Sequence, residues 1–456
     1  MNHDFDLITI GAGSGGVAAS RRAALHGAKV AIVESGRVGG TCVLRGCVPK
    51  KLLMYAASYG DAAHDAAGYG WQWPAGAAPT FDMARWQAAK RAETARLESA
   101  YRDLLAQGKV ELIEGFGRIA GAHSVEVNGR RLSARHILIA TGGAPVRDSI
   151  AGIESCATSD DLLDLTELPD RAAVVGGGYI AVEFASMLSR LGVQVTMLFR
   201  DRLPLRGFDE DLRLRLARNL GDAAIELRPG QAPRQIAHHG PGWRLWLPDG
   251  SQIDRPWVLN ATGRRPNTAG LGLETIGLTT DAGHALAVDA RLQTAVDHVH
   301  AIGDVTNRRH LTPLAIAEGR VLADRLFGGA AGIPVNLNRI ATGVFTLPPI
   351  GSIGPTEAEL ASTGRTLRIY EADFRPMRHA FTGRPQRCYM KLLVDDASDT
   401  VLAVHMIGDD APEIVQSLAV ALTAGATKTH FDATLAVHPT VAEEFVLMRT
   451  PARRVN

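Results

Sequence analysis

The stretch that decides the fold is FDLITIGAGSGGVAASRRAALHGAKVAIVE, residues 5–34. An apolar run over 5–10 predicts a strand, the alanine-rich run over 17–26 predicts a helix, and 29–33 predicts a second strand. This order, with a glycine-rich turn between the first strand and the helix, is typical of a unit that binds a dinucleotide. The sequence therefore predicts an α/β fold that contains a parallel sheet.

The glycines of this turn and the acid after the second strand have separate roles. Gly11 permits the tight turn, Gly13 lets a pyrophosphate approach the backbone at the helix N-terminus, and Gly16 allows close packing of helix and strand. Glu34 is placed to accept hydrogen bonds from a ribose. A glycine-rich turn in an unrelated fold would not require this combination of strand, helix, strand and acid.

A second unit of the same kind follows at 171–199. Its strand over 171–175 runs into GGGYIA, residues 176–181, and a helix and another strand come next. Residues 258–263, VLNATG, also echo 138–143, LIATGG, which indicates an internal duplication. The chain therefore predicts two dinucleotide sites.

The second unit ends differently from the first. Phe199 stands where the first unit has Glu34, and two arginines, Arg200 and Arg206, come after it. Guanidiniums without an acid suit the 2′-phosphate of NADP, because an acid would repel the phosphate and arginine binds it with paired hydrogen bonds. Arginines in open solvent are the alternative, and Asp201 weakens the phosphate interpretation slightly.

Two of the four cysteines lie in GGTCVLRGCVPKK, residues 39–51. In one regular helix the Cα atoms of Cys42 and Cys47 would be about 7.5 Å apart along the axis, beyond the usual disulfide limit of about 7 Å. A bond between them therefore needs a distorted turn, which the flexibility of Gly46 and the helix-disfavouring Pro49 favour. Two buried thiols or half of a zinc site are the alternatives, although zinc usually requires further ligands nearby in sequence.

Composition narrows the possible functions. The chain has 456 residues, of which 46% are hydrophobic and 21% charged, with a net charge of +1. These values predict a globular protein of about three domains and argue against nucleic acid or a membrane surface as a partner. Neither a signal peptide nor a membrane-spanning run is recognisable, so we expect a cytoplasmic protein. There, a Cys42–Cys47 disulfide would be catalytic rather than structural, whereas Cys156 and Cys388 lie alone and are expected to be inert.

Further elements are predicted around the two units. They are helices over 51–64 and 81–108, a loop over 68–80, and strands over 109–119 and 123–139. A short strand over 299–304 ends at Asp304, and Thr312 begins a helix, so both could meet the remaining polar part of the first dinucleotide.

Beyond about residue 336 the pattern changes to an α+β region without fingerprints. Its chemically notable segment is HPTVAEE, residues 438–444. Glu443 could orient His438 and make it more basic, as a general acid–base group requires. Taken alone, the segment also suits the start of an ordinary surface helix.

These segments together resemble the FAD-dependent pyridine nucleotide-disulfide oxidoreductases, and within that family the branch that reduces oxidised glutathione. The motifs that carry the resemblance follow the family's order along the whole chain: GGTCVLRGCVPKK, GGGYIAVEFA, ATGRRPNT, AIGDV, LTPLAIAEGR and HPTVAEE. The fold implied is α/β, with two Rossmann-like dinucleotide-binding domains and a C-terminal α+β dimerisation domain. The implied boundaries are an FAD-binding domain in two segments, 1–145 and 267–335, an NADPH-binding domain, 146–266, and a dimerisation domain, 336–456.

The resemblance also assigns residues to two cofactors, FAD and NADPH, and implies no metal ion. FAD would be held by Gly11, Gly13, Ser14, Gly16, Glu34, Thr41, Thr141, Asp304 and Thr312. NADPH would be bound by Gly176, Gly178, Tyr179, Ile180, Arg200, Arg206 and Gly263. In this arrangement Tyr179 would cover the nicotinamide pocket until the cofactor enters.

The implied reaction has two halves. NADPH would reduce FAD, and reduced FAD would open a Cys42–Cys47 disulfide. Cys47 would face the flavin, and Cys42 would attack the substrate disulfide. Lys50 and Glu183 would form an ion pair near the reactive edge of the flavin.

The resemblance also implies a homodimer that acts on glutathione disulfide. His438, oriented by Glu443, would complete the active site of the partner subunit. The positions that contact glutathione in the family are occupied here by Ser14, Arg21, Tyr101 and Arg320. Each of these alone could be an ordinary surface residue, but Arg21 could pair with a glycine carboxylate.

Related reductases with other substrates would be expected to differ from this sequence at particular positions. A trypanothione reductase would be expected to carry an acid and bulky apolar residues near Ser14 and Arg21, and lipoamide dehydrogenase an acid at Phe199. Mercuric and large thioredoxin reductases have an extra C-terminal cysteine pair, which nothing after Cys388 supplies. A related low-molecular-weight disulfide, such as glutathione amide or a lipoamide-type dithiol, stays open as the substrate. A non-catalytic flavoprotein is the alternative from another class, against which the cysteine pair and His438 count.

Overall fold

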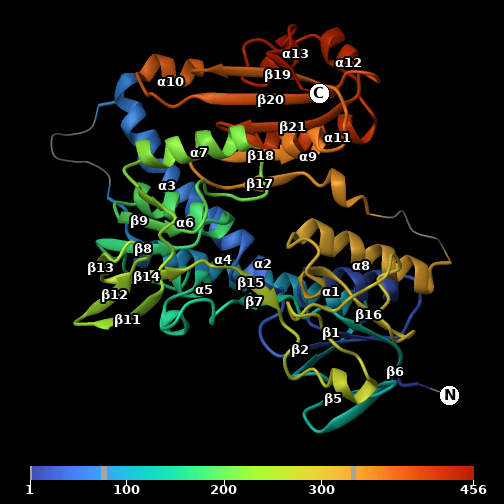
Figure 1. Cartoon of the computed structure of the whole chain (residues 1–456). Helices are drawn as coiled ribbons and strands as arrows, with labels where there is room; N and C mark the ends of the chain where they lie inside the picture. The colour runs from blue at the N-terminus through green and yellow to red at the C-terminus, as the bar shows by residue number, and fades with distance from the viewer. Residues whose placement is uncertain (1–2, 73–79, 330–334, 456) are drawn as a thin grey trace.

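The computed structural model describes residues 3–72, 80–329 and 335–455. Three bodies can be distinguished in Figure 1: the blue strands of the N-terminal segment lie with the gold helix α8 (Thr312–Phe327), the green elements lie beside them, and the orange and red elements form a third body. We call these the first, second and C-terminal domains. Within the described residues, no helix is long and apolar enough to cross a membrane.

The first domain is built on a sheet in the order β3-β2-β1-β6-β5-β4, with β16 beside β6. Its strands are β1 (Phe5–Ile10), β2 (Val30–Glu34), β3 (Glu111–Glu114), β4 (Arg118–Gly121), β5 (Ser124–Val127), β6 (Arg130–Ile139) and β16 (Val299–Ala301). β4, β5 and β6 are antiparallel, whereas β1, β2, β3, β6 and β16 run parallel. Helices α1 (Ser14–Leu25) and α8 pack against each other, so the chain returns late in the sequence to complete this domain.

The predicted strand, helix and strand of the first fingerprint are present as β1, α1 and β2, with α1 beginning inside the glycine-rich turn. The strands predicted over 109–119 and 123–139 are too long. The chain leaves the extended conformation at Gly115, where φ is 145°, and at Asn128, where φ is 52°. The shorter strands β3 to β6 result.

The second domain combines a parallel sheet, β10-β9-β8-β14, with an antiparallel sheet, β11-β12-β13. Its strands are β8 (Arg171–Val175), β9 (Gln194–Phe199), β10 (Glu226–Pro229), β11 (Gln235–His239), β12 (Gly242–Trp246), β13 (Gln252–Arg255) and β14 (Trp257–Asn260). Its helices are α5 (Ser159–Leu162), α6 (Tyr179–Arg190) and α7 (Glu210–Asp222). The antiparallel pair β7 (Gly143–Pro145) and β15 (Arg264–Pro266) joins it to the first domain, beside the predicted boundaries at 145/146 and 266/267.

One contact is repeated in the two dinucleotide-type sheets. Gly11 and Gly176 both have positive φ, 106° and 135°. A Cβ atom would lie 2.5 Å from the carbonyl oxygen of Ala140 at the first position and 2.2 Å from that of Ala261 at the second. Both carbonyls belong to the echoing sequence segments, so the repeat in sequence corresponds to a repeat in packing.

The C-terminal domain is an antiparallel sheet in the order β17-β18-β21-β20-β19-β22, flanked by helices. Its strands are β17 (Thr342–Val344), β18 (Ile350–Ile353), β19 (Leu367–Phe374), β20 (Cys388–Asp395), β21 (Val401–Ile407) and β22 (Arg453–Val455). Its helices are α9 (Glu357–Ala361), α10 (Met377–Thr382), α11 (Ala411–Thr423), α12 (Lys428–Ala433) and α13 (Glu444–Leu447). Every residue of β20 is buried. Because side chains alternate along a strand, one face of β20 packs with α11, α12 and α13, and the other points toward α7 of the second domain.

Three helices lead away from the first fingerprint: α2 (Gly40–Leu44), α3 (Cys47–Gly68) and α4 (Met83–Gln107). The helix predicted over 81–108 corresponds to α4. The helix predicted over 51–64 is longer than expected and begins before Pro49, at Cys47, although no regular helix runs through the whole cysteine segment. Pro49 lies in the first turn of α3, where no backbone N–H is needed. Of the loop predicted over 68–80, residues 73–79 lie outside the described residues.

Candidate active site

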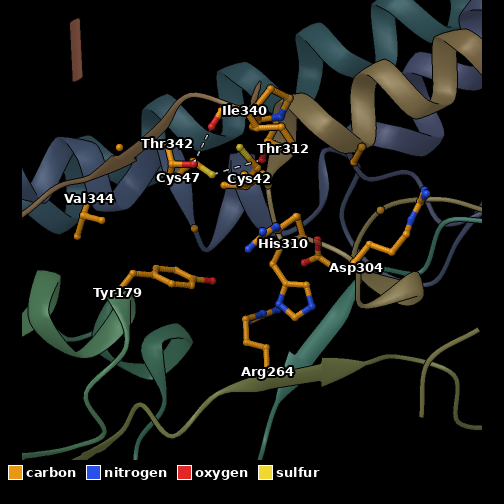
Figure 2. A pocket seen from close by; sticks show the side chains of 18 of the residues that line it. Cys42, Cys47, Tyr179, Arg264, Asp304, His310, Thr312, Ile340, Thr342 and Val344 are labelled. Carbon is orange, nitrogen blue, oxygen red and sulfur yellow. Dashed lines mark hydrogen bonds between the residues drawn. The ribbon is translucent and has the colours of Figure 1, made fainter. Parts of the chain in front are cut away.

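A cavity of about 960 Å³ is bordered by all three domains. It brings together sequence-predicted residues from both fingerprints, the cysteine segment and the start of α8. Those that line it are Gly13, Ser14, Thr41, Cys42, Cys47, Lys50, Tyr179, Ile180, Glu183, Asp304 and Thr312. Figure 2 shows the two cysteines on one side of the cavity and Tyr179 across from them.

The two cysteines lie on separate helices. Cys42 is in α2 and Cys47 begins α3, and the backbone between them leaves the helical conformation at Gly46, with φ −144° and ψ −114°. A Cβ atom at Gly46 would lie 2.8 Å from the backbone oxygen of Thr41, so this break requires glycine. Both cysteines are present as thiols, the reduced form of the predicted disulfide. In the described part of the chain, no group of three or more His, Cys, Asp and Glu residues has the arrangement of a metal site.

The surroundings distinguish the two thiols. A hydrogen bond from Cys42 lowers the pKa of Cys47 to about 6 against the effect of burial, and the Thr312 hydroxyl and the Lys50 charge act in the same direction. The Thr312 Oγ1 lies 3.5 Å from the Cys47 Sγ. The same hydrogen bond, together with burial, raises the pKa of Cys42 far above its ordinary value. The pair therefore carries its negative charge on Cys47 and its proton on Cys42.

Lys50 and Glu183 form an ion pair at the wall of the cavity, with 2.8 Å between the Nζ and Oε1 atoms. Glu183 is 1% exposed and also accepts a 2.8 Å hydrogen bond from the backbone N–H of Phe345. The Nζ of Lys50 lies 4.3 Å from the centre of the Phe345 ring. A residue of the C-terminal domain thus holds both members of a pair formed by the first and second domains.

The fingerprint turns have room for a phosphate. A Cβ atom at Gly13 would meet only the Cα of Gly40, at 3.9 Å, and one at Gly178 would meet nothing within 4 Å. These two glycines are the N-caps of α1 and α6, where backbone N–H groups attract anions. At Gly16, by contrast, a Cβ atom would lie 2.0 Å from the Gly11 oxygen, so this glycine is needed for packing. The chain therefore fits a dinucleotide at each turn.

Other groups assigned to FAD stand around the first turn. The Glu34 carboxylate accepts hydrogen bonds from the N–H groups of Ala12 at 2.7 Å and Gly36 at 2.8 Å, which leaves lone pairs for ribose hydroxyls. The Thr141 hydroxyl donates to the Asn267 carbonyl at 2.7 Å. Thr141 lies between two residues that line the cavity.

The residues assigned to NADPH fall into two groups. Tyr179 and Ile180, at the start of α6, line the cavity, and the ring of Tyr179 points into it in Figure 2. Arg200 and Arg206 lie on the exposed loop after β9, outside the cavity lining, with the Arg206 Nε 4.0 Å from the Asp201 carboxylate. A further residue with this assignment, Gly263, has φ 146° and open space around its Cα.

The predicted glutathione contacts are spread more widely. Ser14 lines the cavity, whereas Arg21 on α1 and Arg320 on α8 are exposed and lie outside its lining. Burial raises the pKa of Tyr101, and electrostatic interaction with Cys42 acts in the same direction, so this phenol is within electrostatic reach of the thiol pair.

The His438 side chain is 80% exposed and does not line the cavity of its own chain. Its Nδ1 lies 3.0 Å from the Oε2 of Glu443. The structure therefore brings His438 and Glu443 together on the surface of a single chain.

Three groups that shape the cavity were not predictable as site residues from the motifs. Phe345 holds the Lys50–Glu183 pair, and His310 lines the cavity near Asp304 in Figure 2. Glu318, which is 2% exposed, accepts hydrogen bonds from the N–H of Gly303 at 2.8 Å and from Arg308 at 2.5 Å. Only Glu318 had a signal in the sequence, namely an acid that follows the mostly apolar run LTPLAIA.

The two dinucleotide-type domains, the thiol pair between them and the separate C-terminal domain define a class of protein, the disulfide oxidoreductases that use two nucleotides. The family model of the pyridine nucleotide-disulphide oxidoreductases matches residues 5–319, and the model of that family's dimerisation domain matches residues 340–449. The chain belongs to this family, which confirms the resemblance and the fold class that the sequence predicted.

Curated relatives match the chain along its whole length. A glutathione reductase of Burkholderia cepacia is 48% identical over 449 residues, which are 98% of this chain and 99% of the relative. The chloroplastic/mitochondrial glutathione reductase of Pisum sativum is 44% identical, covering 100% of this chain and 84% of the relative. A trypanothione reductase of Leishmania donovani is 37% identical, covering 99% and 97%.

Proposed function

We propose that the chain is an NADPH-dependent flavin disulfide reductase that reduces oxidised glutathione to glutathione. The observation that carries this proposal is the single cavity in which the Cys42–Cys47 pair meets the N-termini of both fingerprint helices. The full-length similarity to glutathione reductases supports the choice of substrate. A cytoplasmic location belongs to the same proposal, since an enzyme that consumes NADPH to keep a thiol reduced suits a reducing compartment.

The chain's own residues prepare the site for two nucleotides. When bound, FAD supplies a ring that accepts hydride from NADPH and passes two electrons to the disulfide. The open turn at Gly13 would hold its pyrophosphate, and the buried Glu183 holds Lys50 at the cavity wall through an ion pair. Tyr179, across the cavity from the thiols, would exclude water from the nicotinamide pocket.

The thiols then exchange disulfides with the substrate. The Cys42 sulfur bonds to one glutathione sulfur as the substrate S–S bond breaks, and the departing thiolate takes a proton. The Cys47 thiolate next attacks the Cys42 sulfur, which releases the second glutathione and re-forms the Cys42–Cys47 disulfide.

A base is required for the first step, because Cys42 holds the proton of the reduced pair. His438 of the partner subunit, oriented by its own carboxylate neighbour, would accept that proton and pass it to the leaving thiolate. The exposure of His438 and its separation from the cavity of its own chain support a homodimeric active site.

The decisive experiment measures NADPH oxidation by the purified holoenzyme. We expect turnover with oxidised glutathione and little with NADH, and we expect Cys42→Ser to abolish glutathione reduction while NADPH still reduces the flavin. Retained turnover in Cys42→Ser would contradict the assignment of the attacking thiol. Turnover with the disulfide of glutathione amide or with lipoamide, but not with oxidised glutathione, would mean that the substrate is a related disulfide.

A further inference from the structure

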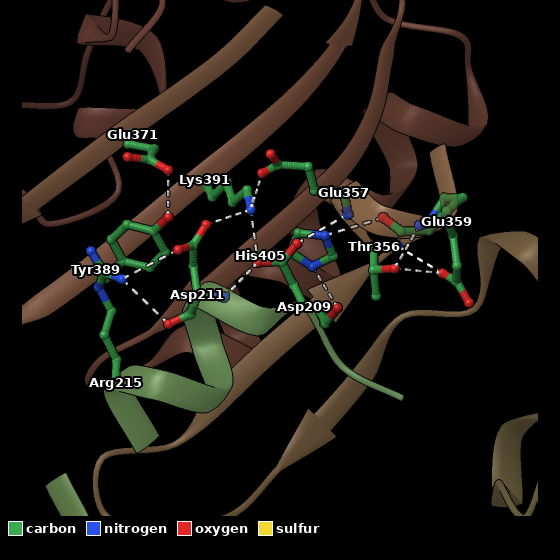
Figure 3. Close-up of polar contacts among 12 residues, drawn as sticks. Asp209, Asp211, Arg215, Thr356, Glu357, Glu359, Glu371, Tyr389, Lys391 and His405 are labelled. Atoms are coloured by element: carbon green, nitrogen blue, oxygen red, sulfur yellow. Dashed lines mark hydrogen bonds and ion pairs between the residues drawn. The ribbon is translucent and has the colours of Figure 1, made fainter. Parts of the chain in front are cut away.

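A buried ionic network joins the second domain to the C-terminal domain (Figure 3). At its centre is Lys391 on β20, which is 1% exposed. Its Nζ lies 2.8 Å from the Oδ1 of Asp209, 2.7 Å from the Oδ2 of Asp211 and 2.7 Å from the Oε2 of Glu357. The three donors of one ammonium group are therefore matched by three carboxylates.

The three carboxylates around Lys391 stabilise its positive charge. Burial alone would lower the pKa of Lys391, but the charge of Asp209 and the hydrogen bonds that Lys391 donates to the three carboxylates raise it overall. Arg453 near the C-terminus contacts Asp211 at 3.0 Å and Glu357 at 2.5 Å. Among the described residues, Asp209 pairs with no second lysine or arginine. His405 also lowers the pKa of Asp209, but burial lowers the pKa of His405 itself, so Asp209 depends on Lys391 more than the other acids of the network do.

Asp209 contacts helices of both domains, α7 of the second domain and α9 of the C-terminal domain. It is the N-cap of α7, and its carboxylate accepts hydrogen bonds at 3.1 Å from the N–H of Asp211 and at 3.1 Å from that of Glu357, the first residue of α9. It also ends the loop 200–209, which follows β9 and carries Arg200 and Arg206. Arg206 is exposed three residues before the buried anchor.

The rest of the loop 200–209 is fixed as well. The N–H of Leu205 donates to the carbonyl of Gly177, in the second fingerprint, at 2.6 Å. Arg213 on α7 donates to the carbonyls of Leu203 and Pro204, each at 2.8 Å. Gly207 and Phe208, next to the anchor, line the large cavity. The loop is thus held in its middle by its own domain and at Asp209 by the C-terminal domain.

We propose that Lys391 is a positioning residue for the coenzyme. By fixing Asp209, it holds the end of the loop 200–209 so that Arg206 faces the 2′-phosphate of NADPH. This inference rests on the proposed function, which assigns Arg200 and Arg206 to that phosphate. Its new content is that a residue of the C-terminal domain, which does not touch the nucleotide, contributes to the preference for NADPH over NADH.

The test compares Lys391→Met with a matched control, Lys428→Met, in the holoenzyme. Lys428 is also 1% exposed and lies in the C-terminal domain, but it pairs with Asp432 on its own helix, α12. Loss of one well-placed charged hydrogen bond corresponds to about a tenfold change. We expect Lys391→Met to raise the KM for NADPH about tenfold, with unchanged KM values for NADH and oxidised glutathione. Lys428→Met should leave the ratio of kcat/KM for NADPH to that for NADH as in the wild type.

A binding measurement makes the test independent of turnover. Inhibition by 2′,5′-ADP, which carries the phosphate, should weaken in Lys391→Met, whereas inhibition by 5′-AMP should not change. Because Lys391→Met leaves Asp209 buried without its cation and could unfold the protein, Asp209→Asn is the second variant. Asparagine keeps the N-cap of α7 but weakens the contact with Lys391, so a smaller shift in the same direction is expected.

Two outcomes separate this inference from the proposed function. If Arg206→Ala lowers the preference for NADPH but folded Lys391→Met and Asp209→Asn keep it, the positioning role is wrong and the NADPH site stands. If Arg206→Ala and Arg200→Ala also keep the preference, the assignment of the phosphate site itself is wrong.

Discussion

At the scale of single residues, two cysteines that look equivalent in the sequence become different groups. Because the pKa of Cys47 is lowered to about 6, reduced protein should gain one thiolate as the pH rises through that value. The gain can be followed by the ultraviolet absorbance of thiolate in the reduced holoenzyme. The hydrogen bond from Cys42 is the main cause, so Cys42→Ala should move the transition to higher pH.

The remaining cysteines do not interfere with this titration. Burial raises the pKa of Cys156 and of Cys388 to about 12 each, so both stay protonated across the range. Cys47→Ser should therefore abolish the transition. A transition near pH 6 that persisted in Cys47→Ser would refute the assignment.

Residues with fixed spacing in a motif could be predicted from the sequence, and those held by distant contacts could not. Cys42, Cys47 and Lys50 lie in one segment of a recognisable pattern, and the cavity contains all three. Phe345 contacts Glu183 across 162 positions of the chain, and nothing in its own neighbourhood marks it. The sequence could therefore predict a segment whose residues line the cavity, but not the residue that holds the ion pair beside them.

At the scale of elements, the break between α2 and α3 determines the relative position of the Cys42 and Cys47 thiols. We expect Gly46→Ala to destabilise the protein by about 1–3 kcal/mol, because its Cβ would push against the backbone oxygen of Thr41. The displacement should also slow re-formation of the Cys42–Cys47 disulfide after reduction. Denaturant unfolding and the rate of thiol loss measure the two effects.

Gly60→Ala is the matched control for this substitution. Gly60 lies on the exposed side of the same helix, α3, and its Cβ would make only an ordinary 3.6 Å contact. This change should stabilise the helix by roughly 0.5–1 kcal/mol and leave the thiols unaffected. Equal effects of the two substitutions would contradict the role given to the break.

The parallel strands β6 and β16 carry a histidine pair that makes the first domain sensitive to acid. The His136 Nδ1 lies 3.3 Å from the His300 Nε2, and burial lowers the pKa of His136 to about 4 and that of His300 to about 3. Unfolded chains take up these protons near pH 6.5. The stabilisation is therefore complete above pH 6.5 and is lost as the pH falls from 6.5 toward 4.

Thermal unfolding as a function of pH tests this account. His300→Leu should give a shallower loss of melting temperature between pH 6.5 and 4 than the wild type. His64, whose side chain is 84% exposed, supplies the control, since His64→Gln should follow the wild-type curve. Identical curves for His300→Leu and the wild type would argue against the pair.

Element types followed from sequence periodicity, but their ends depended on local geometry. The fingerprint strands and helices were predictable because their apolar patterns are long and bounded by glycine. The predicted helix began after Pro49, but a proline that breaks the middle of a helix is acceptable in its first turn. The order β17-β18-β21-β20-β19-β22 was not predictable, because it depends on pairing between distant segments.

At the scale of the whole molecule, an active site shared between subunits predicts complementation. Cys42→Ser and His438→Ala chains should each be inactive in glutathione reduction as homodimers. When the two chains are mixed at random, half of the dimers are mixed and each of these regains one intact site. Co-expressed chains with different tags should therefore show about a quarter of wild-type activity.

The purified mixed dimer sharpens this experiment. It should have about half of wild-type activity, because one of its two sites combines an intact Cys42 with an intact His438. No activity in the mixed dimer would mean that both residues serve the cavity of one chain.

The attachment of the loop 200–209 to Lys391 affects how coenzyme preference can be passed between proteins during evolution. Nucleotide-binding units of this kind look like modules that recombination could exchange between proteins. Here Asp209, at the end of a loop of the second domain, is bound by Glu357 and Lys391, which both lie far beyond that domain in the sequence. If residues 146–266 were transferred to another protein, the two arginines would be transferred with them, but the contacts of Asp209 with Glu357 and Lys391 would be lost. Ancestry of the coenzyme preference should therefore be traced through the C-terminal domain as well as through the fingerprint.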